Sequence, residues 1–502
     1  MSDTSLLNSS PSNYKKGSTL TTNLLFAIFV TCLGPIQFGY HIAELNAPQQ
    51  VMSCDDTATH PNSETGSLDT HGLGWLENHG LKQCIPMTDQ QIGIVTAMFS
   101  IGGLIGSYYA GSLAERYGRK RVNLINNFCF ALFGSLCMFT ANNVIMLILG
   151  RVLVGIAAGV SIVVTSLYIN DIAPVEWRGA LGTMNQLSIN LGILLTQTVA
   201  LKYADVHSWR WIFFVGAFVA LSNFVLWFKI EESPRWLLGH RDQTSAEKAL
   251  YKLRNATYQE VKQELQSWQR SIDSETDQEA HNSNINNNIH TKKLTLLQYV
   301  KSSEFKKPRE AISTILIGQQ FCGINSIIFY GVRLVSELLP NQAVIINLGL
   351  SILNVIFTFI SSSVIERFGR KPLLISSASA MSMMSFIIMI SIMGEHAKLL
   401  VTSIYFYIIA FALGVGPIPF LIIGELSQDG NESKAMAQSY GTVCNWLATF
   451  VVGYGFPVLS KYIDGYVYLI FAIFAAWFAW HIKKAIPETK GKTDYNSVWN
   501  GY

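Results

Sequence analysis

Long apolar stretches alternate with shorter polar ones along most of the 502-residue chain. Runs of about 20 residues without a charged side chain have the length that a helix needs to cross the hydrocarbon core of a bilayer. A first set of six runs lies at 22–42, 91–112, 122–142, 144–170, 180–201 and 211–228. A second set of six lies at 312–332, 343–364, 373–393, 400–424, 436–459 and 465–482. Buried helices of a soluble protein explain one or two such runs, so the twelve together predict an all-α membrane protein with two six-helix bundles.

The polar stretches divide the chain into five parts. We expect a disordered cytosolic N-terminus (1–21), an N-terminal bundle (22–228) with a long non-cytosolic loop (43–90), a cytosolic linker (229–311), a C-terminal bundle (312–482) and a short cytosolic tail (483–502). The linker combines a helical pattern with an Asn-rich flexible segment. Of the 36 Lys and Arg residues, 29 fall on the side that this arrangement makes cytosolic, the asymmetry that orients membrane proteins. Both termini are therefore predicted to be cytosolic, in a plasma membrane or a vacuolar or other endomembrane.

Composition narrows the class of protein further. Charged residues make up 14% of the chain, where soluble domains carry about 25%, and only Arg151 lies inside a predicted span. The formal net charge of +3 is too small to imply an anionic partner, and the shortage of charge argues against disorder and nucleic-acid binding. We find no catalytic triad, metal-ligand or phosphate-loop pattern, so we expect neither an enzyme nor a bound cofactor.

The two sets of spans carry related motifs. Three pairs recur at offsets of 251, 254 and 256 residues: Arg116-Tyr-Gly-Arg-Lys with Arg367-Phe-Gly-Arg-Lys, Asp171 with Glu425, and Glu232 with Glu488. Nearly equal offsets indicate duplicated halves. Two six-helix bundles joined by a long cytosolic loop are the plan of a transporter whose substrate site lies between the halves near the bilayer midplane.

An ordered set of short motifs resembles the sugar porter family of the major facilitator superfamily. Besides the pair of Arg-x-Gly-Arg-Lys motifs, the set comprises Gly39-Tyr-His-Ile-Ala-Glu-Leu-Asn-Ala-Pro-Gln, Gly150-Arg151, Trp177-Arg-Gly-Ala-Leu-Gly-Thr, Glu232-Ser-Pro-Arg, Gln319-Gln-Phe-Cys-Gly-Ile-Asn, Gly416-Pro-Ile-Pro and Pro487-Glu-Thr-Lys-Gly. Each motif is weak alone, but the order is specific and runs from residue 39 to 491. The detail is most similar to glucose facilitators, and the Asn-rich insert is typical of a fungal member. The resemblance implies a monomeric transporter in the bilayer that moves a sugar or polyol by alternating access.

Charged residues of both signs flank the cytosolic ends of the spans. The resemblance implies that they form a latch that stabilises the outward-open state, the alternative being ordinary surface ion pairs of about 0–1 kcal/mol each. The latch candidates are Glu115, Arg116, Arg119, Asp171, Arg178, Glu232, Arg235, Glu366, Arg367, Arg370, Glu425 and Glu488.

The substrate site is expected among neutral polar residues of the spans. Amides donate to and accept from sugar hydroxyls without the cost of burying a charge, and an aromatic ring covers the apolar face of a pyranose. Amides in membrane helices also serve simply to join neighbouring helices. The resemblance implies the sugar-contacting role for Gln186, Gln319, Gln320, Asn325, Asn354, Asn445 and Trp446, with Phe420 in place of the family's usual tryptophan.

Two further departures from the family pattern leave the sugar undefined. Ala412 replaces an acidic residue of many glucose facilitators, and Cys322 replaces the serine of the Gln-Gln-x-Ser-Gly motif. A polyol or another small metabolite therefore stays open beside a hexose. The glycines and prolines between Gly414 and Pro419 predict a break in the tenth helix.

The first span raises the question of energy coupling. Proton-coupled members of the family carry Asp after Gly-Tyr, and facilitators often carry Asn, whereas this chain has His41. An imidazole titrates near physiological pH, and Glu44 follows one helical turn later. We expect facilitated diffusion, with a proton symporter that uses His41 and Glu44 as the alternative. In that alternative protons would be a second partner.

Two smaller questions complete the sequence picture. A non-transporting nutrient sensor on the same scaffold is a third hypothesis, disfavoured because only about 20 residues follow the last span and sensors of this kind signal through long cytosolic tails. Cys54 and Cys84 share the non-cytosolic loop, where either a disulfide or two free thiols is compatible with the sequence.

Overall fold

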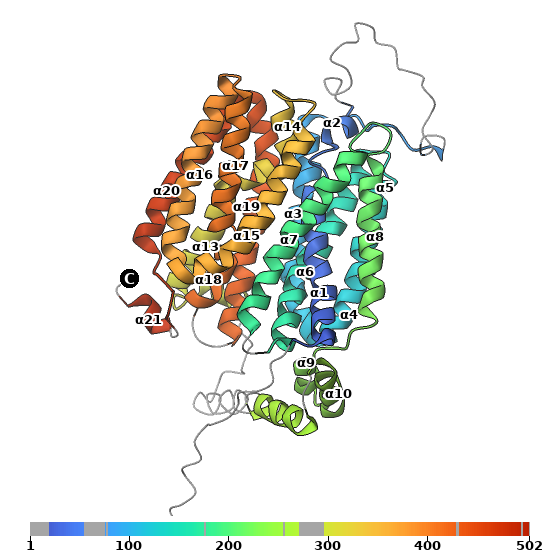
Figure 1. Ribbon diagram of the computed structural model, residues 1–502, viewed down its shortest axis with the longest axis vertical. Helices are drawn as coiled ribbons and strands as arrows, with labels where there is room; N and C mark the ends of the chain where they lie inside the picture. The colour runs from blue at the N-terminus through green and yellow to red at the C-terminus, as the bar shows by residue number, and fades with distance from the viewer. Residues whose placement is uncertain are drawn as a thin grey trace, which may run out of the picture.

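Two helical bundles stand side by side in the computed structural model, with a group of short helices beneath one end (Figure 1). The structure describes residues 20–54, 76, 79–174, 177–254, 257–270, 296–427, 431–492 and 495–500. We call the end that carries the short helices the linker side, and the opposite end, which carries α2 (Gln49–Met52), the loop side. The expected disordered N-terminus and the Asn-rich segment at 273–293 lie outside the described residues.

Six helical crossings form the N-terminal half. They are α1 (Thr22–Ala43), α3 (Asp89–Tyr117), a third crossing made of α4 (Arg119–Ile125), η3 (Asn126–Leu132) and α5 (Phe133–Phe139), α6 (Val144–Ile172), α7 (Arg178–Tyr203) and α8 (Arg210–Trp227). The middle of the third crossing is a π-helix, which the apolar pattern did not predict.

Six more crossings form the C-terminal half. They are α13 (Lys306–Phe321) with α14 (Ile324–Ser336), α15 (Ala343–Phe368), α16 (Arg370–Met393), α17 (Ala397–Leu413) with α18 (Ile418–Leu426), α19 (Asn431–Ile463) and α20 (Val467–Ala485). Ten stretches of the described residues are long and apolar enough to cross a membrane; one of them covers both α19 and α20, and the more polar α7 is not among the ten. The twelve crossings thus form the all-α membrane fold that the apolar runs predict.

Two crossings of the C-terminal half are broken helices. The tenth stops at Leu413 and resumes at Ile418, as its glycines and prolines predict. The seventh breaks at Gly323, whose φ of 98° is the left-handed conformation that glycine adopts most easily. A Cβ at this position would lie 2.6 Å from the ring of Phe471, so packing also excludes a side chain. No proline lies near the break in the seventh crossing, so the sequence did not predict it.

The linker is divided between the two halves. After Ser233, α9 (Pro234–Gly239) and α10 (Gln243–Leu253) pack through an apolar cluster that contains Leu238, Ala246 and Leu250, and α9 contacts α6 of the N-terminal half. On the other side of the Asn-rich segment, α12 (Leu296–Lys301) packs against α19 of the C-terminal half. Each half therefore carries its own part of the linker.

The C-terminal tail is also anchored. In α21 (Tyr495–Trp499) the indole N–H of Trp499 donates to the carbonyl of Leu426 at the end of α18, at 3.2 Å. The tail thus contacts the second segment of the broken tenth crossing.

Candidate functional site

An amide network joins the seventh, tenth and eleventh crossings of the C-terminal half. Gln319 donates from Nε2 to the carbonyls of Val415 (2.8 Å) and Gly416 (3.0 Å), which lie in the break between α17 and α18. Its Oε1 accepts from Nδ2 of Asn445 on α19, at 3.0 Å. Gln319 therefore satisfies carbonyls that the broken helix leaves without a helical partner.

The network continues along α13 and α14. Gln320 donates to Oε1 of Gln319 at 3.3 Å and accepts at its own Oε1 from Asn325. All three side chains are buried. The structure thus brings four of the amides predicted to contact substrate, these three and Asn445, into one uncharged cluster of donors and acceptors.

The remaining predicted contacts occupy different surroundings. Asn354 on α15 exchanges hydrogen bonds of 3.4 Å with Asn190 on α7, and Asn190 also donates to Thr358 at 2.8 Å. These contacts join the two halves, the helix-joining role that a polar residue in a membrane protein can have. Gln186 on α7 and Phe420 on α18 are half-buried.

Two of the three residues that depart from the family pattern, Cys322 and Ala412, are buried. Cys322 is fully buried, and its backbone carbonyl accepts from the hydroxyl of Tyr407 at 2.8 Å. Ala412 is 1% exposed at the end of α17.

Trp446 projects from α19 into the N-terminal half. Its indole N–H donates to Oγ of Ser107 on α3 at 3.0 Å, and its ring meets Phe38 on α1 at a centroid distance of 5.7 Å. A Cβ at Gly103 would lie 2.5 Å from the indole, so the close approach of the ring requires glycine there. The predicted sugar-contacting tryptophan therefore closes a contact between the halves.

A charged cluster lies inside the N-terminal half near the loop side. Nη1 of Arg151 on α6 lies 2.9 Å from Oε1 of Glu44 and donates to the carbonyl of His41 at 2.6 Å. Nδ1 of His41 lies 2.9 Å from the other carboxylate oxygen of Glu44. All three side chains are at most 1% exposed. Glu44 is thus buried against a guanidinium.

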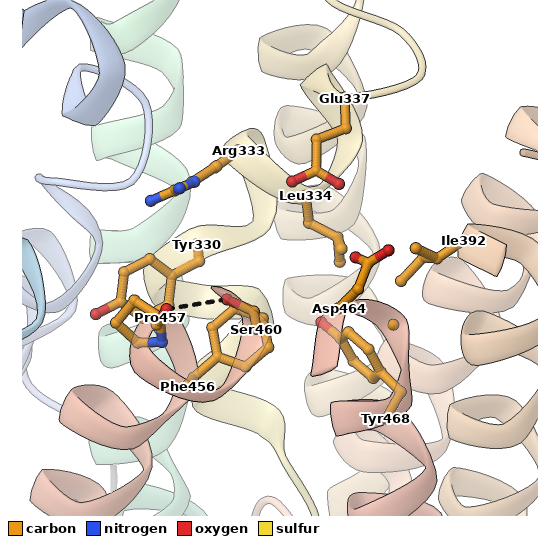
Figure 2. Close-up of a pocket in the computed structure, with 11 residues that line it drawn as sticks. Tyr330, Arg333, Leu334, Glu337, Ile392, Phe456, Pro457, Ser460, Asp464 and Tyr468 are labelled. Atoms are coloured by element: carbon orange, nitrogen blue, oxygen red, sulfur yellow. Dashed lines mark hydrogen bonds between the residues drawn. The ribbon is translucent and has the colours of Figure 1, made fainter. Parts of the chain in front are cut away.

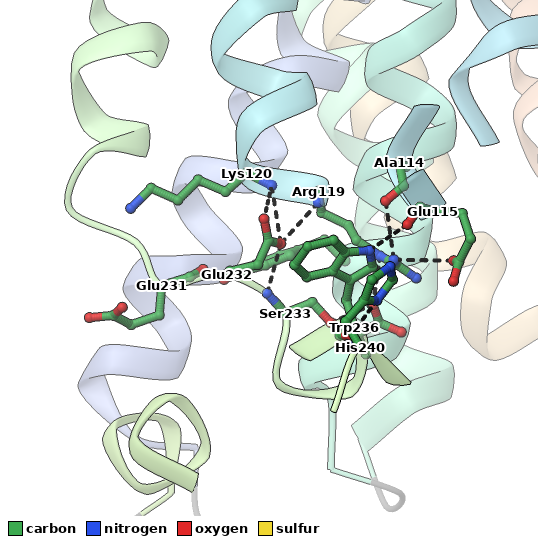
Figure 3. Close-up of polar contacts among 11 residues, drawn as sticks. Ala114, Glu115, Arg119, Lys120, Glu231, Glu232, Ser233, Trp236 and His240 are labelled. Atoms are coloured by element: carbon green, nitrogen blue, oxygen red, sulfur yellow. Dashed lines mark hydrogen bonds and ion pairs between the residues drawn. The ribbon is translucent and has the colours of Figure 1, made fainter. Parts of the chain in front are cut away.

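The latch candidates of the N-terminal half gather on the linker side around the start of α4 (Figure 3). Arg119 lies 3.0 Å from Asp171 and 3.3 Å from Glu115. The carboxylate of Glu232 accepts from the backbone N–H groups of Arg119 (2.9 Å) and Lys120 (3.0 Å). Burial raises the pKa of Glu232, and these N–H donors oppose the rise.

The C-terminal half repeats this arrangement. Arg370 lies 3.0 Å from Glu425 and 3.3 Å from Glu366. Glu488 accepts from the backbone N–H groups of Arg370 and Lys371, each at 3.0 Å. In both clusters the arginine pairs with carboxylates of its own half, so the duplication predicted from sequence extends to the geometry of the contacts.

The other latch candidates lie at the edges of these clusters. The guanidinium of Arg116 lies 5.2 Å from the ring of Tyr117, and that of Arg367 lies 5.8 Å from the ring of Phe368. Arg235 lies over Trp268 in the linker at 4.9 Å. Arg178 is the first residue of α7, and its side chain lies outside the part of the chain that the structure describes.

On the loop side, polar contacts cross between the halves. Asp89 at the start of α3 lies 3.0 Å from Arg333 on α14 and 3.8 Å from Lys461 on α19. The amide oxygen of Asn46 accepts from the backbone N–H of Val332 at 2.9 Å. These contacts hold the halves together on the loop side.

A small pocket of about 30 Å³ lies beside this junction in the C-terminal half (Figure 2). Tyr330 and Phe456 stack in its wall with centroids 5.3 Å apart, and the hydroxyl of Tyr330 donates to the carbonyl of Gly453 at 2.6 Å. The volume admits about one water molecule, so the pocket is too small for a sugar.

The loop at 43–90 is closed on itself by a disulfide. Cys54 and Cys84 are joined, with their Cα atoms 5.3 Å apart. Beyond the disulfide, Arg210 donates to the carbonyls of Lys82 and Ala141, both at 2.7 Å. The alternative of two free thiols does not hold in this structure.

Three residues take part in contacts that the sequence does not predict. Arg151 is the one charge within a predicted span and Glu44 is a predicted proton site, but the sequence does not show that the two side chains pair. Ser107 and Phe99 belong to an apolar pattern of α3 that carries no sign of a contact with Trp446. They could be found only once α3 and α19 were packed together.

Two pseudo-symmetric six-helix halves, a polar site between broken helices and paired charge clusters define a multi-pass membrane transporter of the major facilitator type. The model of the sugar (and other) transporter family matches residues 27–499. The chain belongs to this family.

Relatives and solved structures agree with this assignment. A probable metabolite transport protein of Saccharomyces cerevisiae is 52% identical and is covered over 96% of both chains. Facilitated glucose transporter member 3 of Mus musculus is 30% identical, over 94% of this chain and 92% of the relative. The xylose transporter XylE from E. coli, in a partially occluded inward-open conformation, shares the fold with a TM-score of 0.73 at 24% identity, over 94% of this chain and all of that one.

Proposed function

We propose that this transporter carries a neutral hexose or similar polyhydroxylated metabolite by facilitated diffusion. The amide network around Gln319 carries this proposal, because it offers several donors and acceptors and no charge. Such a site suits hydroxyl groups that both donate and accept, and it gives an ionic substrate no partner for its charge. The glucose and xylose transporters among its relatives support a sugar as the substrate.

The charged cluster in the N-terminal half supports transport without protons. Glu44 and Arg151 balance one another, so the cluster is neutral when His41 is neutral. A proton added to His41 would leave one uncompensated charge in a fully buried site, which is costly. The cluster therefore needs no proton to be stable.

A proton-coupled mechanism is the second candidate. Nε2 of His41 is buried without a hydrogen-bond partner, so the ring has a free position at which a proton could bind. In this mechanism protonation of the ring would weaken the hold of Arg151 on Glu44.

Uptake in liposomes separates these functions. The reconstituted protein is tested with radiolabelled hexoses, pentoses and inositol, with and without a proton gradient. We expect saturable uptake of at least one sugar that equilibrates and does not respond to the gradient. Accumulation driven by the gradient would establish the symporter. A protein that takes up none of these solutes would instead match the nutrient-sensor hypothesis.

We also propose that the linker side faces the cytosol and that its two charge clusters act as a latch between conformations. The excess of basic residues on that side supports the orientation. The matched clusters around Arg119 and Arg370 support the latch, because each fixes a helix end of its own half that can meet the other half when the linker side closes. Replacing Arg370 with Ala is expected to increase maleimide labelling of cysteines placed between the two halves on the linker side. Arg241→Ala, an exposed linker variant, is the control; equal labelling of both variants would reject the latch.

A further inference from the structure

The N-terminal half forms a socket for Trp446, and Phe99 is one of its walls. The ring of Phe99 on α3 meets the indole edge-on, with centroids 5.9 Å apart and an interplanar angle of 73°. Phe38 stacks on Phe99 at 5.9 Å and also meets the indole. Phe99 is fully buried, so it acts on a substrate only through neighbouring side chains such as Trp446.

A third neighbour of Phe99 is Arg151 of the charged cluster. The guanidinium carbon of Arg151 lies 4.7 Å from the centroid of the Phe99 ring, a cation–π contact. Arg151 is itself held by Glu44 and by the carbonyl of His41. The buried charges therefore fix the position of a ring that in turn packs against Trp446 of the other half.

We propose that Phe99, held by Arg151, is a positioning residue that sets the affinity of the substrate site by orienting Trp446. The proposal rests on the proposed function and on the sugar-contacting role that the sequence predicts for Trp446. It gives the buried charge cluster a role in a transporter for a neutral solute: the cluster anchors an aromatic ring that packs against Trp446. Gly103 and Ser107 contact the same indole and form the rest of the socket.

The matched variants are Phe99→Leu and Phe213→Leu. Both phenylalanines are fully buried in the N-terminal half, and both pack edge-on against a tryptophan, which for Phe213 is Trp209 at 5.8 Å. A merely structural role predicts similar effects of the two substitutions on stability and on transport. A positioning role predicts that the two variants differ in KM but not in maximal rate or in stability.

The experiment measures D-glucose uptake and thermal stability in reconstituted protein. Phe99→Leu is expected to raise KM at least fivefold with a maximal rate within twofold of the parent, whereas Phe213→Leu leaves KM unchanged at a similar loss of stability. In the double variant with Trp446→Phe, the effects of Phe99→Leu on KM and on the melting temperature are expected to be less than additive.

Three outcomes bear on the proposal separately from the proposed function. Equal KM values for Phe99→Leu and Phe213→Leu would overturn it. Additive effects with Trp446→Phe on the melting temperature would overturn it even if the parent protein did not transport D-glucose. Absence of uptake by the parent together with non-additive stability would reject D-glucose as substrate and retain the coupling between the two rings.

Discussion

Asp89 and Arg333 join the two halves of the protein on the loop side, with Oδ1 and Nη2 3.0 Å apart. Asp89 begins α3 of the N-terminal half and Arg333 lies on α14 of the C-terminal half, so the ion pair must separate whenever the loop side opens. The two side chains are 25–30% exposed, and a pair in such a position contributes about 0–1 kcal/mol.

Asp89→Asn should therefore shift the protein modestly toward the state that is open on the loop side, by up to about fivefold in the equilibrium. A cysteine at Thr96, which is buried on α3, would react faster with an impermeant maleimide in this variant. Exchange of the two charges in Asp89→Arg/Arg333→Asp is expected to restore the slow rate. Asp205→Asn is the control, since Asp205 caps a turn within one half.

Breaking the buried ion pair should destabilise the protein strongly. Glu44→Gln leaves Arg151 buried without its counter-charge, and the loss of one partner of a buried pair costs about 3–5 kcal/mol. The double replacement Glu44→Leu/Arg151→Met removes both charges and is expected to recover most of this stability. Thermal denaturation in detergent measures both; a Glu44→Gln variant as stable as the parent would show that Arg151 finds another partner.

Gln319 joins the amide network to the break in the tenth crossing. Gln319→Ala would leave the carbonyls of Val415 and Gly416 without their donor, at about 1–3 kcal/mol. If this cost destabilises the conformation that binds substrate, KM rises about 5- to 150-fold. Gln342→Ala, at an exposed position before α15, should leave KM unchanged. Uptake kinetics of the two variants decide the matter.

Tyr299 in the linker offers a substitution that should not destabilise. Its ring is fully buried between Phe305 and Tyr440, and its hydroxyl has no hydrogen-bond partner. Burial raises the pKa of Tyr299 to about 12, so the hydroxyl stays protonated below about pH 11. Tyr299→Phe removes a buried hydroxyl that has no partner and should be neutral or stabilising by up to about 1 kcal/mol. A fall in melting temperature at pH 7 would contradict this expectation.

The topology of the fold was accessible from sequence because it depends on local properties. Apolar length fixes each crossing, and the repeated motifs locate the charges that later meet as Arg119 with Asp171 and Arg370 with Glu425. The break at Gly323 was not predicted, because no proline marks it and the ring of Phe471 that excludes a side chain there lies on a distant helix.

In the candidate site, too, the sequence predicts the residue types but not the contacts between distant helices. Composition and motif order pointed to the amides, and four of them do meet in one network. The contact of Trp446 with Ser107 and Phe99 depends on how α3 packs against α19, and no periodicity within either helix encodes that pairing.

The division of the linker has a consequence for how the protein can be made. The linker helices up to residue 270 pack with the N-terminal half, and α12 packs with the C-terminal half. The packing that the structure describes therefore does not depend on an unbroken chain between these two parts. Two polypeptides, ending and beginning within the Asn-rich segment, should therefore assemble into a working transporter when they are produced together. The single chain would then ensure that the two halves are made in equal amounts, while contacts between their helices would bring the halves together.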